Sequence, residues 1–297
     1  MQIMRFRSPD GFRLGVVVDD ALADLTAIRH DAPRDVADLL RRGPGVLAEV
    51  ADQVKRATRA QMMALSGALP ALPIAVPAKF ICLGLNYADH VSESAYSTQA
   101  YPTLFMRAAT SLLAHDEAME RPLASAQLDY EAELAVIVGR TMRHVNADEA
   151  IAGVAGYACF NDGSVREFQR HTVQWTMGKN FDHTGGFGPL FVTADELPRG
   201  AAGLRIDCRV NGEVRQSDNT ANMIFKVGET LSYISQGMTL QPGDVIAMGT
   251  PSGVAHAHKP PKWLVHGDVV EVEIEGIGVL RNPIVNERDQ APDLAVA

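Results

Sequence analysis

Five apolar residues in a row, Leu134 to Val138, follow directly after Asp129-Tyr130-Glu131-Ala132-Glu133. An unbroken apolar run of this length is typical of a strand covered on both faces, so the chain is predicted to contain a buried sheet. Because side chains alternate along a strand, Glu131 and Glu133 are predicted to point to one face at the mouth of that sheet. If both carboxylates are buried there, they need a cation nearby. The alternative, which the spacing of the two residues alone favours, is that they lie on a solvent-exposed strand face.

Residues 270 to 275 provide a comparison within the same chain. There Glu271, Glu273 and Glu275 alternate strictly with valine and isoleucine. Strict alternation is typical of a strand with one exposed face. The two glutamate pairs of the chain are therefore predicted to lie in different environments.

Composition and charge exclude several functional classes. The 297-residue chain carries 27 Lys and Arg against 36 Asp and Glu, and it has no long basic block, which argues against a nucleic acid partner. The first residues lack the apolar core of a signal peptide, and no run is apolar for long enough to span a membrane. A cytoplasmic protein is predicted. Buried free thiols are predicted for Cys82, Cys159 and Cys208.

A proline-rich stretch divides the chain. Residues 2–18 are predicted to form a hairpin, and residues 36–42 and 44–65 to form helices. Pro70, Pro73 and Pro77 interrupt regular structure over 66–79. The predicted organisation is a small N-terminal domain, residues 1–78, followed by a larger domain, residues 79–297. Further strands are predicted at 79–85, 154–160 and 245–248, hairpins at 204–216 and 270–280, a helix over 220–237 and a mobile tail over 286–297.

His90 and Glu93 are three positions apart in a segment that Asn86 precedes. If this segment is helical, the two side chains share a face and can form a hydrogen bond. A carboxylate bound to an imidazole fixes its tautomer and raises its basicity, as a general base requires. An exposed ion pair on the helix surface is the alternative.

Further polar residues follow the predicted strand 154–160. Asp162 precedes a segment in which Arg166 and Gln169 fall on one helical face; capping of that helix is its alternative role. Lys179 precedes a glycine-rich loop and could be an ordinary surface lysine. Gly249 and Thr250 begin a second glycine-rich loop, which lacks the lysine of a phosphate-binding P-loop.

Six motifs occur in the order and at the spacing seen in fumarylacetoacetate hydrolases, so the sequence over roughly 79 to 286 resembles that family. The motifs are Gly84 to Glu93, Asp129 to Leu134, Asn161 to Gln169, Gly178 to Asp182, Gln241 to Ile246 and Gly249 to Val254. The resemblance implies an α+β, β-rich fold, with a rolled mixed β-sheet and flanking helices, preceded by a small N-terminal α/β domain. It also implies a homodimer.

The resemblance also implies roles for individual residues. Glu131, Glu133 and Asp162 would bind Mg²⁺, with Mn²⁺ or Ca²⁺ as alternatives, and an all-carboxylate set agrees with a hard cation. His90 and Glu93 would activate water. The remaining residues would contact a small 2-oxo acid: Lys179 and Arg166 through its negative charge, Gln169 directly, and Thr250 with Gly249 through its carboxylate.

The implied reaction is metal-dependent hydrolysis of a carbon–carbon bond in an acylpyruvate or related 2,4-diketo acid. Decarboxylation or keto–enol isomerisation of a 2-oxo acid such as oxaloacetate is the first alternative, because it also needs an enolate held on a metal. A metal-binding protein without catalysis and a metal-dependent nuclease are further alternatives.

Some positions depart from the family pattern. Arg107 stands where many members have lysine, Gly163 replaces a common valine, and the loop after Asp182 lacks a bulkier proline-containing version. These departures leave the identity of the substrate open. Asp129 is predicted to have a structural role rather than to bind the metal.

Overall fold

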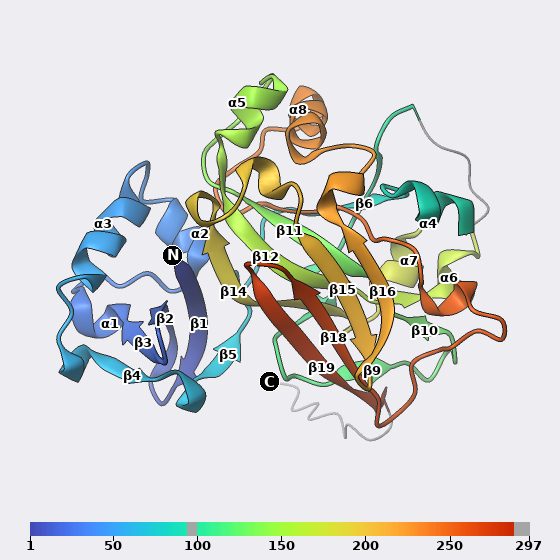
Figure 1. Cartoon of the computed structure of the whole chain (residues 1–297), viewed down its shortest axis with the longest axis horizontal. Coiled ribbons are helices and arrows are strands. Elements are labelled where there is room, and N and C mark those ends of the chain that lie inside the picture. The colour runs from blue at the N-terminus through green and yellow to red at the C-terminus, as the bar shows by residue number, and fades with distance from the viewer. Residues whose placement is uncertain (94–99, 288–297) are drawn as a thin grey trace, which may run out of the picture.

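The computed structural model of the chain describes residues 1–93 and 100–287. Its N-terminal part is a strand meander with three short α-helices, as Figure 1 shows. Strands β1 (Gln2–Ser8) and β2 (Gly11–Val18) pair antiparallel, which confirms the predicted hairpin. The other elements of this part are β3 (Ala21–Asp24), α1 (Leu25–Ile28), α2 (Val36–Leu40), α3 (Val46–Val54), β4 (Met62–Ala64) and β5 (Leu69–Ala71).

Two predictions for this part are wrong in detail. The helix predicted over 44–65 ends at Val54, because Met62–Ala64 pairs with β3 and tertiary pairing outweighs helix propensity there. The proline-rich stretch contains strand β5, which pairs with β1 and includes Pro70. Proline is tolerated in such a strand when it lies at a sheet edge.

The remainder of the chain builds most of a 12-stranded mixed sheet and a separate five-stranded sheet. The large sheet has the central order β1-β14-β12-β11-β17-β6-β7, with β17 parallel to β6 and the other pairs on this path antiparallel. The five-stranded sheet has the order β16-β15-β18-β19-β9, and β10 pairs with β13 in a two-stranded sheet. The predicted α+β, β-rich class with flanking helices is confirmed. The strands are β6 (Phe80–Gly84), β7 (Thr103–Met106), β8 (Leu112–Leu113), β9 (Met119–Arg121), β10 (Leu128–Asp129), β11 (Ala132–Val138), β12 (Val154–Asp162), β13 (Ser164–Val165), β14 (Gly185–Thr193), β15 (Arg205–Val210), β16 (Glu213–Asn219), β17 (Val245–Ala247), β18 (Val269–Ile274) and β19 (Gly278–Asn286).

In the part of the chain that the structure describes, five helices belong to this larger portion, and they lie at the ends of the strands (Figure 1). The predicted helix over 220–237 begins only at residue 227, because residues 220–222 form a short 3-10 turn. The segment after Asp162 is likewise mostly non-helical. The helices are α4 (Ala88–Glu93), α5 (Ala147–Ile151), α6 (Arg166–Gln169), α7 (Thr176–Lys179) and α8 (Val227–Gly237).

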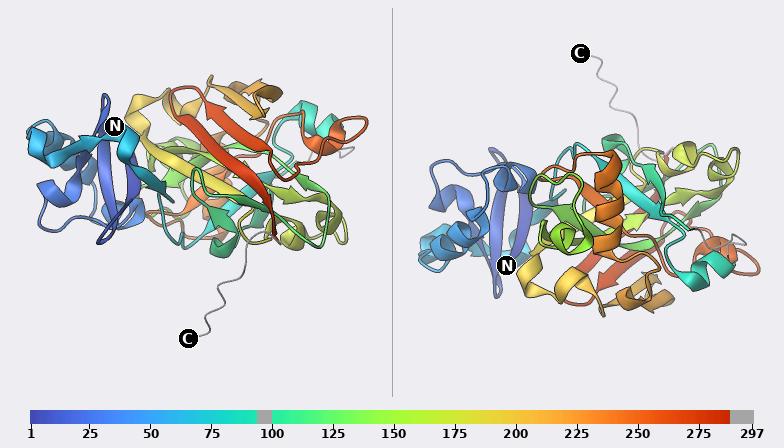
Figure 2. Two further views of the ribbon diagram at one scale, coloured as in Figure 1. Left: turned by 90° about the horizontal axis from the view of Figure 1, so that it is seen from below. Right: turned by 90° about the horizontal axis from the view of Figure 1, so that it is seen from above.

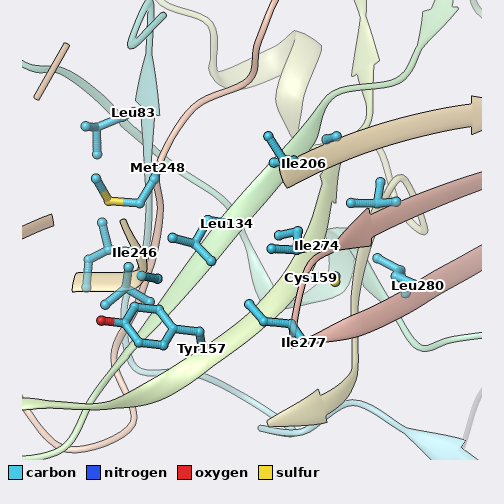
Figure 3. Close-up of a cluster of buried hydrophobic side chains, with 14 of the residues drawn as sticks. Leu83, Leu134, Tyr157, Cys159, Ile206, Ile246, Met248, Ile274, Ile277 and Leu280 are labelled. Carbon is cyan, nitrogen blue, oxygen red and sulfur yellow. The ribbon is translucent and has the colours of Figure 1, made fainter. Parts of the chain in front are cut away.

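The core explains the unbroken apolar run. Every residue of β11 is buried, which confirms the prediction of a strand covered on both faces. On one face, Leu134 and the β12 residue Cys159 pack with Ile206, Ile274 and Leu280 of the five-stranded sheet (Figure 3). On the other face, Ala135 and Ile137 belong to a cluster that includes apolar residues of α2. Burial of these large side chains contributes about 1.5–3 kcal/mol each.

Strand β18, which contains Glu271 and Glu273, has one exposed face, as predicted. In β18 the burial alternates, with Val270, Val272 and Ile274 buried and the glutamates partly exposed. Glu271 and Glu273 form ion pairs with Arg209 on the neighbouring strand β15.

The two parts of the chain share the large sheet. Strand β1 pairs antiparallel with β14, with Gln2 opposite Val192 and Met4 opposite Leu190. The N-terminal elements lie together at one end of the molecule in both views of Figure 2. The boundary at residue 78 stays a prediction.

Other predictions have mixed outcomes. Cys82, Cys159 and Cys208 are buried free thiols, as predicted. Within the described ranges, no helix is both long and apolar enough to cross a membrane. Most of the predicted mobile tail, residues 288–297, lies outside the described residues.

Candidate active site

Strands β11 and β12 bring three carboxylates together at one end of the large sheet. Glu133 lies in β11, Asp162 ends β12, and Glu131 immediately precedes β11. The backbone N–H of Asp162 donates to the carbonyl of Glu131 at 2.9 Å, which holds these two residues side by side. Oxygen atoms of all three buried carboxylates lie within 4.8 Å of one another. The structure therefore groups the three residues predicted to bind a metal.

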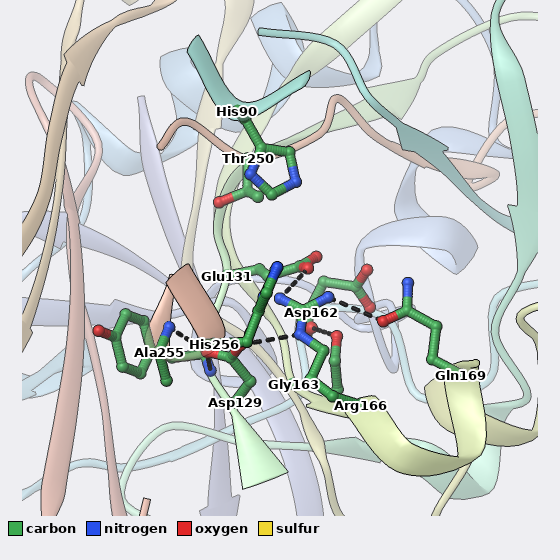
Figure 4. Close-up of polar contacts among 12 residues, drawn as sticks. His90, Asp129, Glu131, Asp162, Gly163, Arg166, Gln169, Thr250, Ala255 and His256 are labelled. Atoms are coloured by element: carbon green, nitrogen blue, oxygen red, sulfur yellow. Dashed lines mark hydrogen bonds and ion pairs between the residues drawn. The ribbon is translucent and has the colours of Figure 1, made fainter. Parts of the chain in front are cut away.

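Two buried cations contact these carboxylates. Lys179 Nζ lies 2.7 Å from Glu131 Oε2 and 2.6 Å from Asp162 Oδ2. Arg166 Nη2 lies 2.5 Å from Glu131 Oε1, and Arg166 Nη1 donates to Gln169 Oε1 at 2.8 Å (Figure 4). Helix α6 supplies Arg166 and Gln169, and helix α7 supplies Lys179. Because Lys179 is buried, it is not an ordinary surface lysine.

Asp162 is a strand residue and does not cap a helix. Its Oδ1 accepts a bond from Arg107 Nη1 at 2.5 Å, while its Oδ2 faces Lys179. Arg107 is 4% exposed and also donates to Gly163 O and Thr184 Oγ1. The arginine that departs from the family pattern thus fixes the orientation of one carboxylate of the cluster.

Asp129 supports the site from behind, as the prediction of a structural role requires. It accepts bonds from Arg166 Nε at 2.8 Å and from the backbone N–H groups of Ala255 and His256 at 2.7 and 3.2 Å. Although burial raises the pKa of the Asp129 carboxyl, the positive charge of Arg166 holds it below its ordinary value. Asp129 thereby anchors both the arginine and the loop that follows Gly253.

The three clustered carboxyls differ in their electrostatics. Burial opposes ionisation of Glu131, but Arg166 and Lys179 outweigh it and lower the pKa of Glu131. The pKa of Glu133 is raised well above its ordinary value by burial and by the charges of Asp162 and Glu131. Among the described residues, Glu133 forms no ion pair. It accepts a bond from the Gly249 N–H at 2.9 Å.

The Gly249–Gly253 loop closes another side of the site. Gly249 has a φ of 81°, a conformation that favours glycine, and its N–H is directed to Glu133. Thr250 is buried, and its Oγ1 accepts a bond from Gln216 Nε2 at 2.8 Å. The predicted contact of Gly249 and Thr250 with a substrate carboxylate stays a prediction.

His90 and Glu93 form the predicted pair on helix α4. His90 Nδ1 lies 2.9 Å from Glu93 Oε1, and His90 is 6% exposed, so the pair is not a solvated surface contact. The Gly253 N–H donates to both carboxylate oxygens of Glu93, at 3.1 and 3.0 Å. Glu93 therefore joins the histidine to the glycine-rich loop.

A cavity connects these groups. His90 and Thr250 lie on one side of Glu131 and His256 on the other (Figure 4). Sequence reasoning missed several lining residues, although His256 follows the glycine-rich loop and Arg170 follows Gln169. The cavity is lined by Leu83, Gly84, Leu85, His90, Phe105, Glu131, Glu133, Arg166, Gln169, Arg170, Trp175, Lys179, Thr250 and His256.

The donor set fits a hard divalent cation. Three converging carboxylates offer only oxygen, which suits Mg²⁺, Mn²⁺ or Ca²⁺ and not a metal that prefers nitrogen or sulfur. A cation placed there would also neutralise the repulsion around Glu133. The functional role of each predicted site residue stays a prediction.

Comparison with known proteins agrees with this geometry. Residues 79–285 match the family model described as fumarylacetoacetate (FAA) hydrolase C-terminal. A Bos taurus protein named oxaloacetate tautomerase FAHD2A, mitochondrial, is 36% identical over an alignment of 291 residues that covers 96% of this chain and 92% of that protein.

Two solved structures extend the comparison. The fumarylacetoacetate hydrolase of Exiguobacterium antarcticum has a TM-score of 0.84 and 36% identity, covering 97% of this chain and 100% of that chain. The maleylpyruvate hydrolase of Sphingobium sp. SYK-6, in complex with manganese(II) ion and pyruvate, has a TM-score of 0.80 and 29% identity, covering 96% of this chain and 99% of that chain.

Proposed function

The chain belongs to the fumarylacetoacetate hydrolase family, and on this premise we propose that it is a metal-dependent keto–enol tautomerase of a small 2-oxo acid such as oxaloacetate. This reaction was the alternative in the sequence-based interpretation. It moves ahead of hydrolysis because the relative from Bos taurus, which matches almost the whole chain, is named an oxaloacetate tautomerase.

The observation that carries the proposal is the cluster of Glu131, Glu133 and Asp162, of which Glu131 and Glu133 line the cavity, with Lys179 between Glu131 and Asp162. A divalent cation held by these carboxylates would act as a Lewis acid on the 1-carboxylate and 2-oxo oxygen of the substrate. Mg²⁺ is the ion we propose. Support for a divalent ion comes from the donor set and from the manganese in the similar maleylpyruvate hydrolase structure.

Proton transfer is assigned to His90. With Glu93 at Nδ1, the neutral imidazole keeps Nε2 as a base that can remove a proton from C3 of the keto form. The C3–H bond breaks and its electron pair forms the C2–C3 double bond, while the C2–O π bond opens to leave a negative charge on the 2-oxo oxygen. This oxygen takes up a proton from water to give the enol, and His90 releases to water the proton that it removed. The charges of Lys179 and Arg166 stabilise the negative charge that develops on this oxygen.

Hydrolysis of an acylpyruvate remains the second candidate, because the His90–Glu93 pair also suits activation of water. Cleavage of the carbon–carbon bond then leaves a pyruvate enolate on the same site. The name and bound pyruvate of the similar maleylpyruvate hydrolase favour this candidate. Decarboxylation of oxaloacetate would use the same enolate.

We also propose that the protein is cytoplasmic and that it forms a homodimer.

The test compares reactions on one preparation. With Mg²⁺ or Mn²⁺ present, ultraviolet absorbance follows enol oxaloacetate, and pyruvate release follows acetylpyruvate cleavage and oxaloacetate decarboxylation. We expect tautomerisation to be the fastest of these reactions in the wild-type protein. His90→Ala should abolish tautomerisation while Mn²⁺ binding persists. Glu131→Ala or Asp162→Ala should abolish both tautomerisation and Mn²⁺ binding. Full tautomerase activity in His90→Ala would contradict the assigned base. Rapid acetylpyruvate cleavage without tautomerisation would favour the second candidate.

A further inference from the structure

The basic side chains that line the cavity differ in how they are paired. Arg166 and Lys179 each contact two buried carboxylates. His90 contacts Glu93, and Nδ1 of His256 lies 3.4 Å from an Asp129 oxygen. Arg170 also lines the cavity, yet within residues 1–93 and 100–287 no carboxylate forms an ion pair with it. Among the described residues, its positive charge is therefore not neutralised by a carboxylate.

The position of Arg170 indicates which part of a substrate it would meet. Exposure increases along the wall from Lys179 at 1% and Arg166 at 3% to Gln169 at 8%, and Arg170 is exposed. Arg170 directly follows Gln169, whose Oε1 is held by Arg166. The wall thus leads from the carboxylate cluster outward to Arg170. A substrate whose 2-oxo end is bound at the cluster would place its other end toward the more exposed part of the lining, to which Arg170 belongs.

The charges around the site favour an anionic substrate. Five carboxylates, Glu93, Asp129, Glu131, Glu133 and Asp162, are arranged around it together with three buried cations, Arg107, Arg166 and Lys179. With Arg170, these groups carry five negative and four positive formal charges. A divalent cation adds two positive charges, so the complete site would carry a net positive charge and is complementary to an anion.

We propose that Arg170 is a specificity-determining residue that binds the distal carboxylate of a dicarboxylic 2-oxo acid. The inference rests on the proposed function and assigns the recognition of the second carboxylate to a residue that the reaction itself does not use. A guanidinium suits this role because it can bind a carboxylate through two parallel hydrogen bonds.

The test pairs ligands that differ only by the distal carboxylate. Malate and lactate binding is measured by calorimetry on the Mn²⁺-loaded full chain, and KM and kcat are measured for oxaloacetate. Arg170→Gln should weaken malate binding and raise the oxaloacetate KM by about tenfold or more, with kcat within about twofold and lactate binding unchanged. Arg170→Lys should give an intermediate loss, since the charge remains without the fork.

Two further variants serve as controls. Arg56→Gln removes an exposed arginine on the N-terminal part and should leave both affinities unchanged. The proposal would be overturned if Arg170→Gln weakened the binding of malate and of lactate equally. It would also be overturned if His256→Asn lost the preference for malate over lactate while Arg170→Gln kept it. If wild-type protein does not tautomerise oxaloacetate, the proposed function fails, and the two binding affinities still decide the role of Arg170.

Discussion

Lys179 and Asp162 form an ion pair that solvent barely reaches: Nζ lies 2.6 Å from Oδ2, and the two side chains are 2% and 0% exposed. The same ammonium group contacts Glu131 at 2.7 Å. Although burial lowers the pKa of Lys179, the charges of Asp162 and Glu131 outweigh it, and the pKa lies above its ordinary value. The lysine is therefore held in its charged form between two carboxylates.

Replacing this lysine should destabilise the metal-free protein. Lys179→Met leaves two buried carboxylates without their shared cation, and removal of one partner from a buried pair costs about 3–5 kcal/mol. Addition of Mn²⁺ should restore part of that stability in the variant, because an ion can replace the lost charge. Urea unfolding with EDTA and with Mn²⁺ measures both effects. Unchanged stability in EDTA would contradict the prediction.

Replacing Glu133 should have the opposite effect on the stability of the metal-free protein. Its raised folded-state pKa means that its contribution to stability is present below about 4.5, the ordinary value, and is lost as pH rises through the folded pKa. In EDTA, Glu133→Gln should remove this loss, so that the variant is at least as stable as wild type near neutral pH. The Mn²⁺ affinity of Glu133→Gln should be lower than that of the wild type by more than about tenfold. Urea unfolding across a pH series and calorimetry test the two halves of this prediction separately.

Glu93 should have two separable effects, because it contacts both His90 and the Gly253 N–H. Glu93→Gln keeps an acceptor for the loop and should mainly lower kcat, by about 10²-fold. Glu93→Ala also frees the loop and should raise KM in addition. Steady-state kinetics of both variants test this. Equal KM values would show that the loop does not depend on Glu93.

Gly178 should not tolerate alanine. A Cβ there would lie 2.3 Å from the backbone nitrogen of Gln169, so α6 and α7 would have to separate. We expect a loss of about 1–3 kcal/mol and lower activity, since Lys179 and Gln169 would both move. Gly237→Ala is the matched control: apart from its chain neighbours and the backbone of its own helix, no atom lies within 4 Å of a Cβ placed there, and stability should be unchanged or slightly higher. Thermal unfolding distinguishes the two variants.

Local patterns predicted much of the fold. The unbroken run 134–138 identified the doubly covered strand, and alternation around Glu273 identified the half-exposed one. Met62–Ala64 was placed in a helix instead, because its strand state depends on pairing with β3, a contact distant in sequence. Patterns with a period of two or 3.6 residues do not contain such information.

The site was predictable where a motif carried it. Glu131, Glu133 and Asp162 meet as the resemblance implies, whereas spacing alone favoured an exposed strand face for Glu131 and Glu133 and left helix capping open for Asp162. Arg170 and His256 were missed because they belong to no motif and reach the cavity only through the paths of α6 and of the loop after Gly253. The pairing of Arg107 with Asp162 likewise depends on tertiary structure.

The pairing of β1 with β14 has a consequence for shortened forms of the protein. Removal of the N-terminal part would leave the backbone groups of residues 190–192 without their partners in β1. Residues 190–192 of β14 would then present an open edge on the side away from β12, the strand that carries Asp162, while Gly185 and Gly186 would keep their pairing with β8. Exposed strand edges promote association between molecules. A chain that begins near residue 79 should therefore aggregate, even though it would retain every residue assigned to the site.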